Sequence, residues 1–145
     1  MVDVGAKPIT VRRAVAVAEV RIPAACRRVL AAGGDTRKGN VFAVARLAGI
    51  MAAKRTHELI PLCHPLALDA IDVEVALTAG RVRIRAAVAC QARTGVEMEA
   101  LTAAGVAALT VYDMLKAISH DLIIDGVQLL EKDGGRSGRI RRRRT

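Results

Sequence analysis

Residues 70–86 have the sequence AIDVEVALTAGRVRIRA, in which apolar residues alternate with polar ones on both sides of a short turn signal. Asp72 and Glu74 are the charged members of the first half, and arginines occupy alternate positions in the second half. A period of two indicates β-strands with one buried face, and the Thr78-Ala79-Gly80 segment supplies a turn between them. The stretch therefore predicts an antiparallel hairpin in which an acidic row of side chains faces a basic one.

The rest of the chain supplies two more strands and three helices. We expect a strand over residues 9–22, a short helix between Pro23 and Gly33, a longer helix over 38–59, a helix over 97–118 and a strand over 122–130. Proline near a helix start, glycine past its end and apolar residues at helical spacing support the helices. The order β, α, α, β, β, α, β is the split βαβ arrangement of ferredoxin-like folds with an additional helix. This is an α+β class in which helices cover one face of an antiparallel sheet.

Composition indicates one domain with few aromatic residues. The chain has 145 residues, of which 52% are hydrophobic but only 1% aromatic, so the core must be built from Ala, Val, Leu and Ile. A chain of this length is long enough to bury such a core. We assign residues 1–135 to a single domain and 136–145 to a basic tail that we expect to be disordered.

The basic tail also explains much of the charge. The formal net charge is +9, and the tail contains six arginines between Arg136 and Arg144. Charge runs at chain ends are more often solvated than bound to nucleic acid, so we favour a solvated tail over a nucleic-acid-binding arm.

The cysteines and the chain start indicate the cell compartment. Cys26, Cys63 and Cys90 are odd in number and lack C-x-x-C spacing, which argues against a disulfide framework and a structural zinc site. The first ten residues lack the pattern of a signal peptide, and the apolar stretches are shorter than the roughly 18 residues of a membrane span. We expect a cytoplasmic protein with reduced thiols and no membrane partner.

Two short motifs contain candidate binding residues. His64 follows Cys63 in a turn bracketed by Pro61 and Pro65, so the imidazole is either part of a rigid turn or directed towards a ligand. Lys38 precedes the longer predicted helix, and a helix N-terminus with a nearby lysine can hold a phosphate.

The helix predicted over 97–118 contains charged residues near both ends. Asp113 and Lys116 are three residues apart, so their side chains lie on one face and can pair. Glu99 and Asp113 are fourteen residues apart, which corresponds to about 21 Å along a helix. Both can contact one small substrate only if the Glu97-Met98-Glu99 segment folds back before the helix, or if a neighbouring subunit completes the site. We favour the second explanation.

Four segments of the sequence resemble one protein family in the same order. They are MVDVGAKPITVRRA (1–14), KGNVFAVARLAGIMAAKRTHELIPLCHPL (38–66), TGVEMEALTAAGVAALTVYDMLKA (94–117) and LLEKDGGRSG (129–138). These segments closely resemble the molybdenum cofactor biosynthesis protein C family, the cyclic pyranopterin monophosphate synthases. The resemblance implies a lyase that converts 3',8-cyclo-7,8-dihydro-GTP to cyclic pyranopterin monophosphate with loss of pyrophosphate. It also implies a homohexamer, a trimer of dimers, with pockets near subunit boundaries.

Carried over by motif, the resemblance implies the residues of the site. Asp113 resembles the principal catalytic acid/base residue, Lys116 its cationic partner and Lys38 the pocket lysine. The substrate-binding positions that it implies are Leu62, Cys63, His64, Glu97, Met98, Glu99, Arg12 and Lys7. The cations Lys38, Lys116 and Arg12 suit a triphosphate and a departing pyrophosphate. We expect no metal ligand and no tightly bound cofactor in the protein, with Mg²⁺ accompanying the triphosphate as an open alternative.

The chain departs from the family pattern at three positions, and two other functions stay open. Asn40 stands where the family usually has Asp, Asp133 where it has Ser, and Arg136 where Lys is common. A catalytically silent structural paralogue would carry the same residue types. A nucleic-acid-binding module is disfavoured because base stacking needs aromatic residues on the sheet, and Phe42 and Tyr112 both lie outside the predicted strands.

Overall fold

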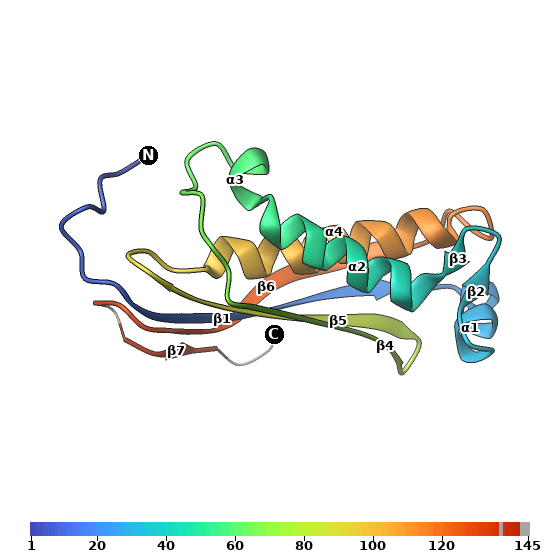
Figure 1. Ribbon diagram of the computed structural model, residues 1–145. Helices are drawn as coiled ribbons and strands as arrows, with labels where there is room; N and C mark the ends of the chain where they lie inside the picture. The colour runs from blue at the N-terminus through green and yellow to red at the C-terminus, as the bar shows by residue number, and fades with distance from the viewer. Residues whose placement is uncertain (137, 143–145) are drawn as a thin grey trace.

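The structure, a computed structural model, describes residues 1–136 and 138–142. Its strands are β1 (Thr10–Arg21), β2 (Asp35–Thr36), β3 (Gly39–Asn40), β4 (Ala70–Thr78), β5 (Arg81–Ala92), β6 (Ile123–Asp133) and β7 (Ile140–Arg141). Its helices are α1 (Ala24–Ala31), α2 (Val41–Lys54), α3 (Thr56–Leu59) and α4 (Glu97–Leu115). Figure 1 shows α2 and α4 lying beside each other over one face of the sheet.

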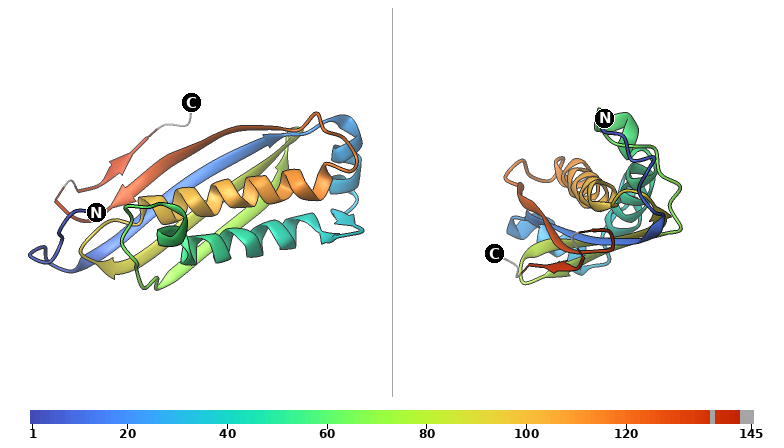
Figure 2. Two further views of the ribbon diagram at one scale, coloured as in Figure 1. Left: turned by 90° about the horizontal axis from the view of Figure 1, so that it is seen from above. Right: turned by 90° about the vertical axis from the view of Figure 1, so that its left-hand side faces the viewer.

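The sheet has the connectivity expected of a ferredoxin-like fold. Five antiparallel strands lie in the order β4-β5-β1-β6-β7, and β2 pairs with β3 in a separate small hairpin. Figure 2 shows the two long helices on one side of the sheet, with α1 and the β2–β3 hairpin at one end. The predicted α+β class and the order of the long elements are confirmed, whereas β2, β3, α3 and β7 were not predicted from the sequence.

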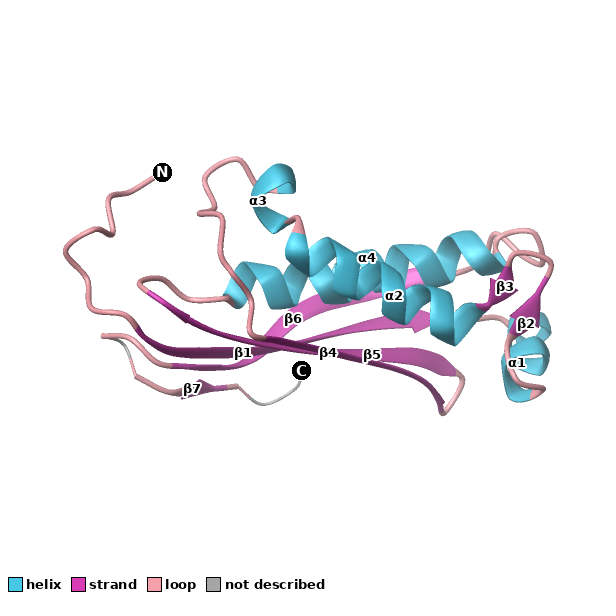
Figure 3. Ribbon diagram, in the orientation of Figure 1, coloured by secondary structure: helices cyan, strands magenta, loops and turns pink. Residues whose placement is uncertain are grey.

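The predicted helix over residues 38–59 is divided in two, so this part of the prediction was wrong. Asn40 caps the start of α2, because its side chain accepts from the amides of Phe42 and Ala43. The backbone leaves the helical region at Arg55, with φ −118° and ψ 19°. Just after the break, the buried Thr56 hydroxyl donates to main-chain carbonyls of the last turn of α2. The short helix α3 then continues in a new direction (Figure 3).

The β4–β5 hairpin has the predicted turn. Ala79 and Gly80 connect the strands with φ of 46° and 80°, the two positive values that a type I′ turn needs. Acidic and basic side chains share the face away from the helices, but Glu74 and Arg85 are directly opposite whereas Asp72 faces an alanine. The predicted acidic and basic rows are therefore present, but Glu74 is the only acidic residue of β4 that lies directly opposite an arginine of β5.

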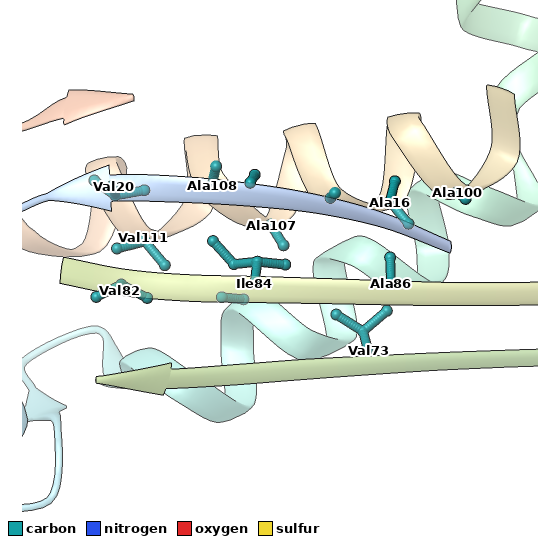
Figure 4. Packing of buried hydrophobic residues seen from close by; sticks show 14 of the residues in the cluster. Ala16, Val20, Val73, Val82, Ile84, Ala86, Ala100, Ala107, Ala108 and Val111 are labelled. Carbon is teal, nitrogen blue, oxygen red and sulfur yellow. The ribbon is translucent and has the colours of Figure 1, made fainter. Parts of the chain in front are cut away.

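The core between the sheet and the helices is built from aliphatic residues. Ile84, Val82, Val73 and Val20 are fully buried under α4 and α2, and Figure 4 shows them with the small side chains of α4. The fully buried residues of α4 include Ala100, Ala103, Ala104, Ala107 and Ala108. Such small residues let the helix approach the sheet closely, which compensates for the lack of aromatic side chains.

The α2–α4 crossing depends on one glycine. A Cβ atom on Gly49 of α2 would lie 2.9 Å from the carbonyl oxygen of Ala103 and 3.3 Å from Val73 Cγ1. The backbones of the two helices therefore approach more closely than a methyl group permits.

Part of the basic tail belongs to the sheet. Strand β7 pairs with β6, with Arg141 opposite Glu131, and the Arg142 amide donates to the Leu130 carbonyl over 2.7 Å. The predicted disorder of the tail also concerns residues 137 and 143–145, which lie outside the described residues, and it stays a prediction for them.

Helix α4 is the one described helix that is long and apolar enough to cross a membrane. Half of its 18-residue apolar window is buried inside the fold. The apolar residues of α4 are thus explained by its place in the core.

Candidate functional site

A cluster of one carboxylate and two lysines lies at the C-terminal end of α4. Lys38 Nζ lies 2.7 Å from Asp113 Oδ2, and Lys116 Nζ lies 2.8 Å from Asp113 Oδ1. Lys38 Nζ also donates to the Asp113 carbonyl over 3.2 Å. The three side chains are about half exposed. The predicted Asp113–Lys116 pairing is present, and the structure adds Lys38 to it.

The two ammonium groups determine the protonation of Asp113. The hydrogen bond from Lys116, followed by that from Lys38, lowers the pKa of Asp113 to about 2. The same contact with Asp113 raises the pKa of Lys116 above its ordinary value. At neutral pH Asp113 is therefore ionised and Lys116 protonated. In this state the cluster suits anion binding better than proton abstraction.

Lys38 is presented by the β2–β3 hairpin and not by the start of α2. The amide of Lys38 donates to the Thr36 hydroxyl, which itself donates to the Gly39 carbonyl. The first amides of α2 already have partners, because Asn40 Oδ1 accepts from Phe42 and Ala43. These two amides are therefore not free to bind a phosphate, and phosphate binding beside Lys38 stays a prediction. The cationic group in this region is the Lys38 ammonium, which contacts Asp113.

A pocket of about 220 Å³ lies at the opposite, N-terminal end of α4. Six predicted substrate-binding residues line it: Leu62, Cys63, His64, Glu97, Met98 and Glu99. Val2, Leu66, Thr94 and Gly95 complete the lining. The fold thus brings the two motifs together, although more than 30 residues separate Leu62 from Glu97.

His64 faces this pocket and is held by the N-terminal segment. Its Nε2 atom lies 2.9 Å from the Val2 carbonyl oxygen, so Nε2 must carry the donated hydrogen. The turn that carries it is closed by a hydrogen bond from the Cys63 amide to the Ile60 carbonyl. His64 therefore stands in a closed turn and also lines the pocket, and its contact with a ligand stays a prediction.

Glu99 is the buried acid of the pocket. Its side chain is 4% exposed, and burial raises its pKa, opposed in part by a backbone hydrogen bond and assisted by Glu97. A raised pKa makes the carboxyl group a stronger base than an ordinary glutamate. Burial also raises the pKa of Cys63, which therefore carries a thiol and is a packed residue of the lining.

The remaining predicted residues, Arg12 and Lys7, lie outside the Asp113 cluster and are not among the lining residues of the pocket. Arg12 is buried and donates to the main-chain carbonyls of Ala92 and Arg93, so it ties β1 to the end of β5. Lys7 lies in the exposed N-terminal segment and is not among the described lining residues. Lys132 was missed: its Nζ lies 3.6 Å from Glu97 Oε1, and its side chain is 14% exposed. No sequence signal marks it, because two register shifts in the pairing of β6 with β1 break the alternation along the strand.

One continuous helix separates the two groups. Glu97 is the first residue of α4 and Asp113 lies in its last turn, so Glu99 and Asp113 are about 21 Å apart. The alternative in which the Glu-Met-Glu segment folds back is excluded.

The pocket at the N-terminal end of α4 is smaller than the roughly 300 Å³ at which ligand sites begin. In the described residues no three His, Cys, Asp or Glu side chains are grouped as metal ligands.

Comparisons with known proteins identify the family of the chain. A relative from Roseiflexus sp. (strain RS-1), a cyclic pyranopterin monophosphate synthase, is 56% identical over 141 residues, which cover 95% of this chain and 88% of the relative. The sequence model of the MoaC family matches residues 1–135, a range that includes both groups of site residues. The chain therefore belongs to the MoaC family.

Proposed function

We propose that this member of the MoaC family is a cyclic pyranopterin monophosphate synthase whose active site is completed by two protomers. Family membership and the 56% identical relative support the lyase activity in molybdenum cofactor biosynthesis. The separation of the Asp113 cluster from the Glu99 pocket by the length of α4 supports the shared site. This separation is the observation that carries the proposal.

An isologous contact would join the two groups. In a two-fold dimer the same surface is used by both subunits, so the C-terminal end of one α4 can meet the N-terminal end of its partner. Each dimer would then contain two equivalent sites, each with Asp113 from one protomer and Glu99 from the other. Assembly into a hexamer, as a trimer of such dimers, is part of the proposal.

The lysines would hold the triphosphate of 3',8-cyclo-7,8-dihydro-GTP. Phosphate oxygens compete with Asp113 for Lys38 and Lys116, and each ammonium that turns to phosphate no longer lowers the pKa of the carboxylate. Asp113 then becomes a stronger base when the substrate binds. It can take the proton of the sugar hydroxyl that attacks the innermost phosphorus, while the lysines stabilise the charge of the departing pyrophosphate.

The Glu99 pocket would serve the base of the nucleotide. Conversion of the purine-derived ring into a pterin requires several proton transfers, and Glu99 and His64 are the groups of this pocket suited to them. The protein itself supplies no metal ligand set in this proposal, and any Mg²⁺ would arrive with the triphosphate. We place the enzyme in the cytoplasm.

Two alternatives predict different results. A silent paralogue would bind the substrate without releasing pyrophosphate. A nucleic-acid-binding module is disfavoured further, because Phe42 lies on α2 and Tyr112 on α4, so the sheet offers no aromatic side chain for base stacking.

The activity is tested by incubating the purified protein with 3',8-cyclo-7,8-dihydro-GTP and measuring pyrophosphate and cyclic pyranopterin monophosphate. We expect both products in equal amounts. Absence of pyrophosphate with a folded, substrate-binding protein would identify a silent paralogue.

The shared site is tested by mixing two inactive variants, Asp113→Asn and Glu99→Gln, in co-expressed assemblies. Random pairing leaves both groups intact in roughly a quarter of two-protomer sites, so activity should return to about that fraction. The matched control combines Asp113→Asn with Lys116→Ala, which damage the same end of α4, and should recover nothing. An inactive first mixture that assembles normally would contradict the shared site without affecting the assigned reaction.

A further inference from the structure

The Asn40 side chain makes four hydrogen bonds, which is the full capacity of an amide with one acceptor pair and two donors. Its Oδ1 accepts from the amides of Phe42 and Ala43, each over 3.1 Å. Its Nδ2 donates to the Gly33 carbonyl over 2.8 Å and to Asp35 Oδ1 over 2.9 Å. Asn40 thus joins three segments: the end of the α1 loop, strand β2 and the first turn of α2.

These contacts fix the orientation of the Asn40 amide and give its oxygen and its nitrogen different functions. Two partners are N–H donors and two are oxygen acceptors. Exchanging Oδ1 and Nδ2 would therefore place a donor against a donor or an acceptor against an acceptor at every contact. The oxygen caps α2, which Asp or Ser could do equally well. The nitrogen donates to the Gly33 carbonyl and to Asp35, which a carboxylate cannot do. The family usually has Asp at this position, so this function of the nitrogen belongs to the pair that Asn40 forms with Asp35 in this chain.

The tied segment is the one that presents Lys38. Asn40 faces Asp35 across the β2–β3 hairpin, and Thr36 faces Gly39. In the turn closed by the Thr36–Gly39 pair, the Lys38 amide donates to the Thr36 hydroxyl and its Nζ reaches Asp113. The hairpin is only two residues long on each side, so it has few other bonds to keep it in place.

Close packing around Gly34 leaves the hairpin little room to take another position. Gly34 has φ +83°, and a Cβ atom there would lie 2.8 Å from the Phe42 ring. The Gly34 carbonyl accepts from the Val41 amide over 2.9 Å. The loop is therefore fixed on the α2 side, and Asn40 Nδ2 fixes it on the hairpin side.

We infer that Asn40, with Asp35 as its acceptor, is a positioning residue that holds the β2–β3 hairpin so that Lys38 reaches Asp113. The inference rests on the proposed function of Lys38 as an anion-holding residue of the active site. Asn40 itself does not touch the substrate. Its amide nitrogen acts through the hairpin.

Asn40→Asp is the most informative substitution. It keeps the oxygen that caps α2, and therefore keeps the helix start. It loses both donors and places a second carboxylate against Asp35, so the hairpin is repelled instead of held. Asn40→Ser is the second variant, since it also caps the helix, lacks the amide donors and adds no charge.

The experiment measures kcat and KM for pyrophosphate release in Lys38→Ala, Asn40→Asp, Asn40→Ser and the double variant Lys38→Ala/Asn40→Asp. Displacement of a positioned group by about 1 Å can cost up to roughly 100-fold, so we expect a loss of roughly 10- to 100-fold for Asn40→Asp. The double variant should be no less active than Lys38→Ala alone, because Asn40 acts only through Lys38. Melting temperatures should show that all four variants are folded.

A readout independent of turnover is the NMR titration of the Asp113 carboxyl. Displacing Lys38 removes one of the two ammonium groups beside Asp113, so Asn40→Asp and Asn40→Ser should raise its apparent pKa as Lys38→Ala does. Asp35→Asn is the matched control: Oδ1 of the new amide can still accept from Asn40, so both turnover and titration should stay at wild-type values.

A rescue variant tests the part assigned to Asp35. In Asp35→Asn/Asn40→Asp the donor and acceptor exchange places, so activity should rise above that of Asn40→Asp. Absence of such a rise would overturn the role of Asp35.

The remaining outcomes distinguish a failure of the inference about Asn40 from a failure of the proposed function of Lys38. If Lys38→Ala is inactive but Asn40→Asp and Asn40→Ser turn over at the wild-type rate, Asn40 is only a helix cap and the inference is wrong. An additive loss in the double variant would also overturn it, since Asn40 would then act independently of Lys38. If Lys38→Ala itself is fully active, the proposed function of Lys38 fails, whereas the effect of Asn40 on the Asp113 titration can still be observed.

Discussion

Lys38 Nζ lies 2.7 Å from Asp113 Oδ2, although 75 residues separate the two along the chain. With Lys116 on the other carboxylate oxygen, Asp113 is held between two ammonium groups at the end of α4. This arrangement keeps a negative charge at a place where substrate phosphates would otherwise bind freely. In the proposed mechanism the reaction therefore begins with an exchange of partners, and the predictions for this cluster depend on that exchange.

Asp113→Asn should lower kcat for cyclic pyranopterin monophosphate formation by at least roughly 100-fold, because the amide cannot accept the hydroxyl proton. The melting temperature should stay near that of the wild type, since the ion pairs of Asp113 are half exposed and such pairs contribute little to stability. Steady-state kinetics and differential scanning calorimetry check the two parts. A variant with wild-type turnover would remove Asp113 from the chemistry.

The titration of Asp113 should differ between the two lysine variants. Lys116 has the larger effect on its pKa, which lies near 2 instead of the ordinary 3.8. We expect Lys116→Ala to raise this pKa more than Lys38→Ala, as measured by carboxyl ¹³C chemical shifts. In the wild type the stabilisation from these pairs is present above pH 3.8 and is lost as the pH falls to about 2. Equal shifts in both variants would contradict the ranking.

Glu99→Gln should lower turnover yet increase stability at neutral pH. The pKa of Glu99 is raised above its ordinary 4.5 by burial. Stability linked to this carboxyl is therefore present below pH 4.5 and decreases as the pH rises through the folded-state pKa. The amide removes this dependence, so the variant should melt above the wild type at pH 8 and close to it at pH 4. A lower melting temperature at pH 8 would show that the ionised carboxylate has a stabilising partner.

Gly49→Ala should destabilise the fold by about 1 to 3 kcal/mol through crowding at the helix crossing. The new methyl group would lie 2.9 Å from the Ala103 carbonyl oxygen, a backbone atom that cannot move aside without α4. Gly105→Ala is the matched control, since the nearest atom to its Cβ, Val127 Cγ2, is at 3.9 Å. There the better helix propensity of Ala should stabilise by up to about 1 kcal/mol. Urea unfolding of both variants measures the difference, and equal signs would contradict the packing argument.

The long elements could be predicted because their signals are local. The alternation around Glu74 and Arg85 specifies the β4–β5 hairpin, and the spacing of Asp113 and Lys116 specifies one face of α4. The helix break at Arg55 was not predicted, because no proline or glycine marks it. Strands as short as β2, β3 and β7 have no period to detect.

The site was predictable by residue type but not by arrangement. The motifs identify Glu99, His64 and Asp113, yet only the fold shows that the first two share a pocket and that the third lies at the far end of the helix. The partner of Asp113 from outside the helix, Lys38, depends on a tertiary contact that no local pattern specifies. The same is true of Lys132, whose pairing with Glu97 joins β6 to the start of α4.

The continuity of α4 has a consequence for how this protein can change. The carboxylates Glu99 and Asp113, one from each group, are both attached to this rigid helix, so no loop can absorb an alteration in the spacing between them. Insertion of a single residue between Glu99 and Asp113 would turn Asp113 by about 100° and displace it by about 1.5 Å along the axis. If Glu99 and Asp113 serve one shared site, as proposed, the interior of α4 must therefore keep its residue count.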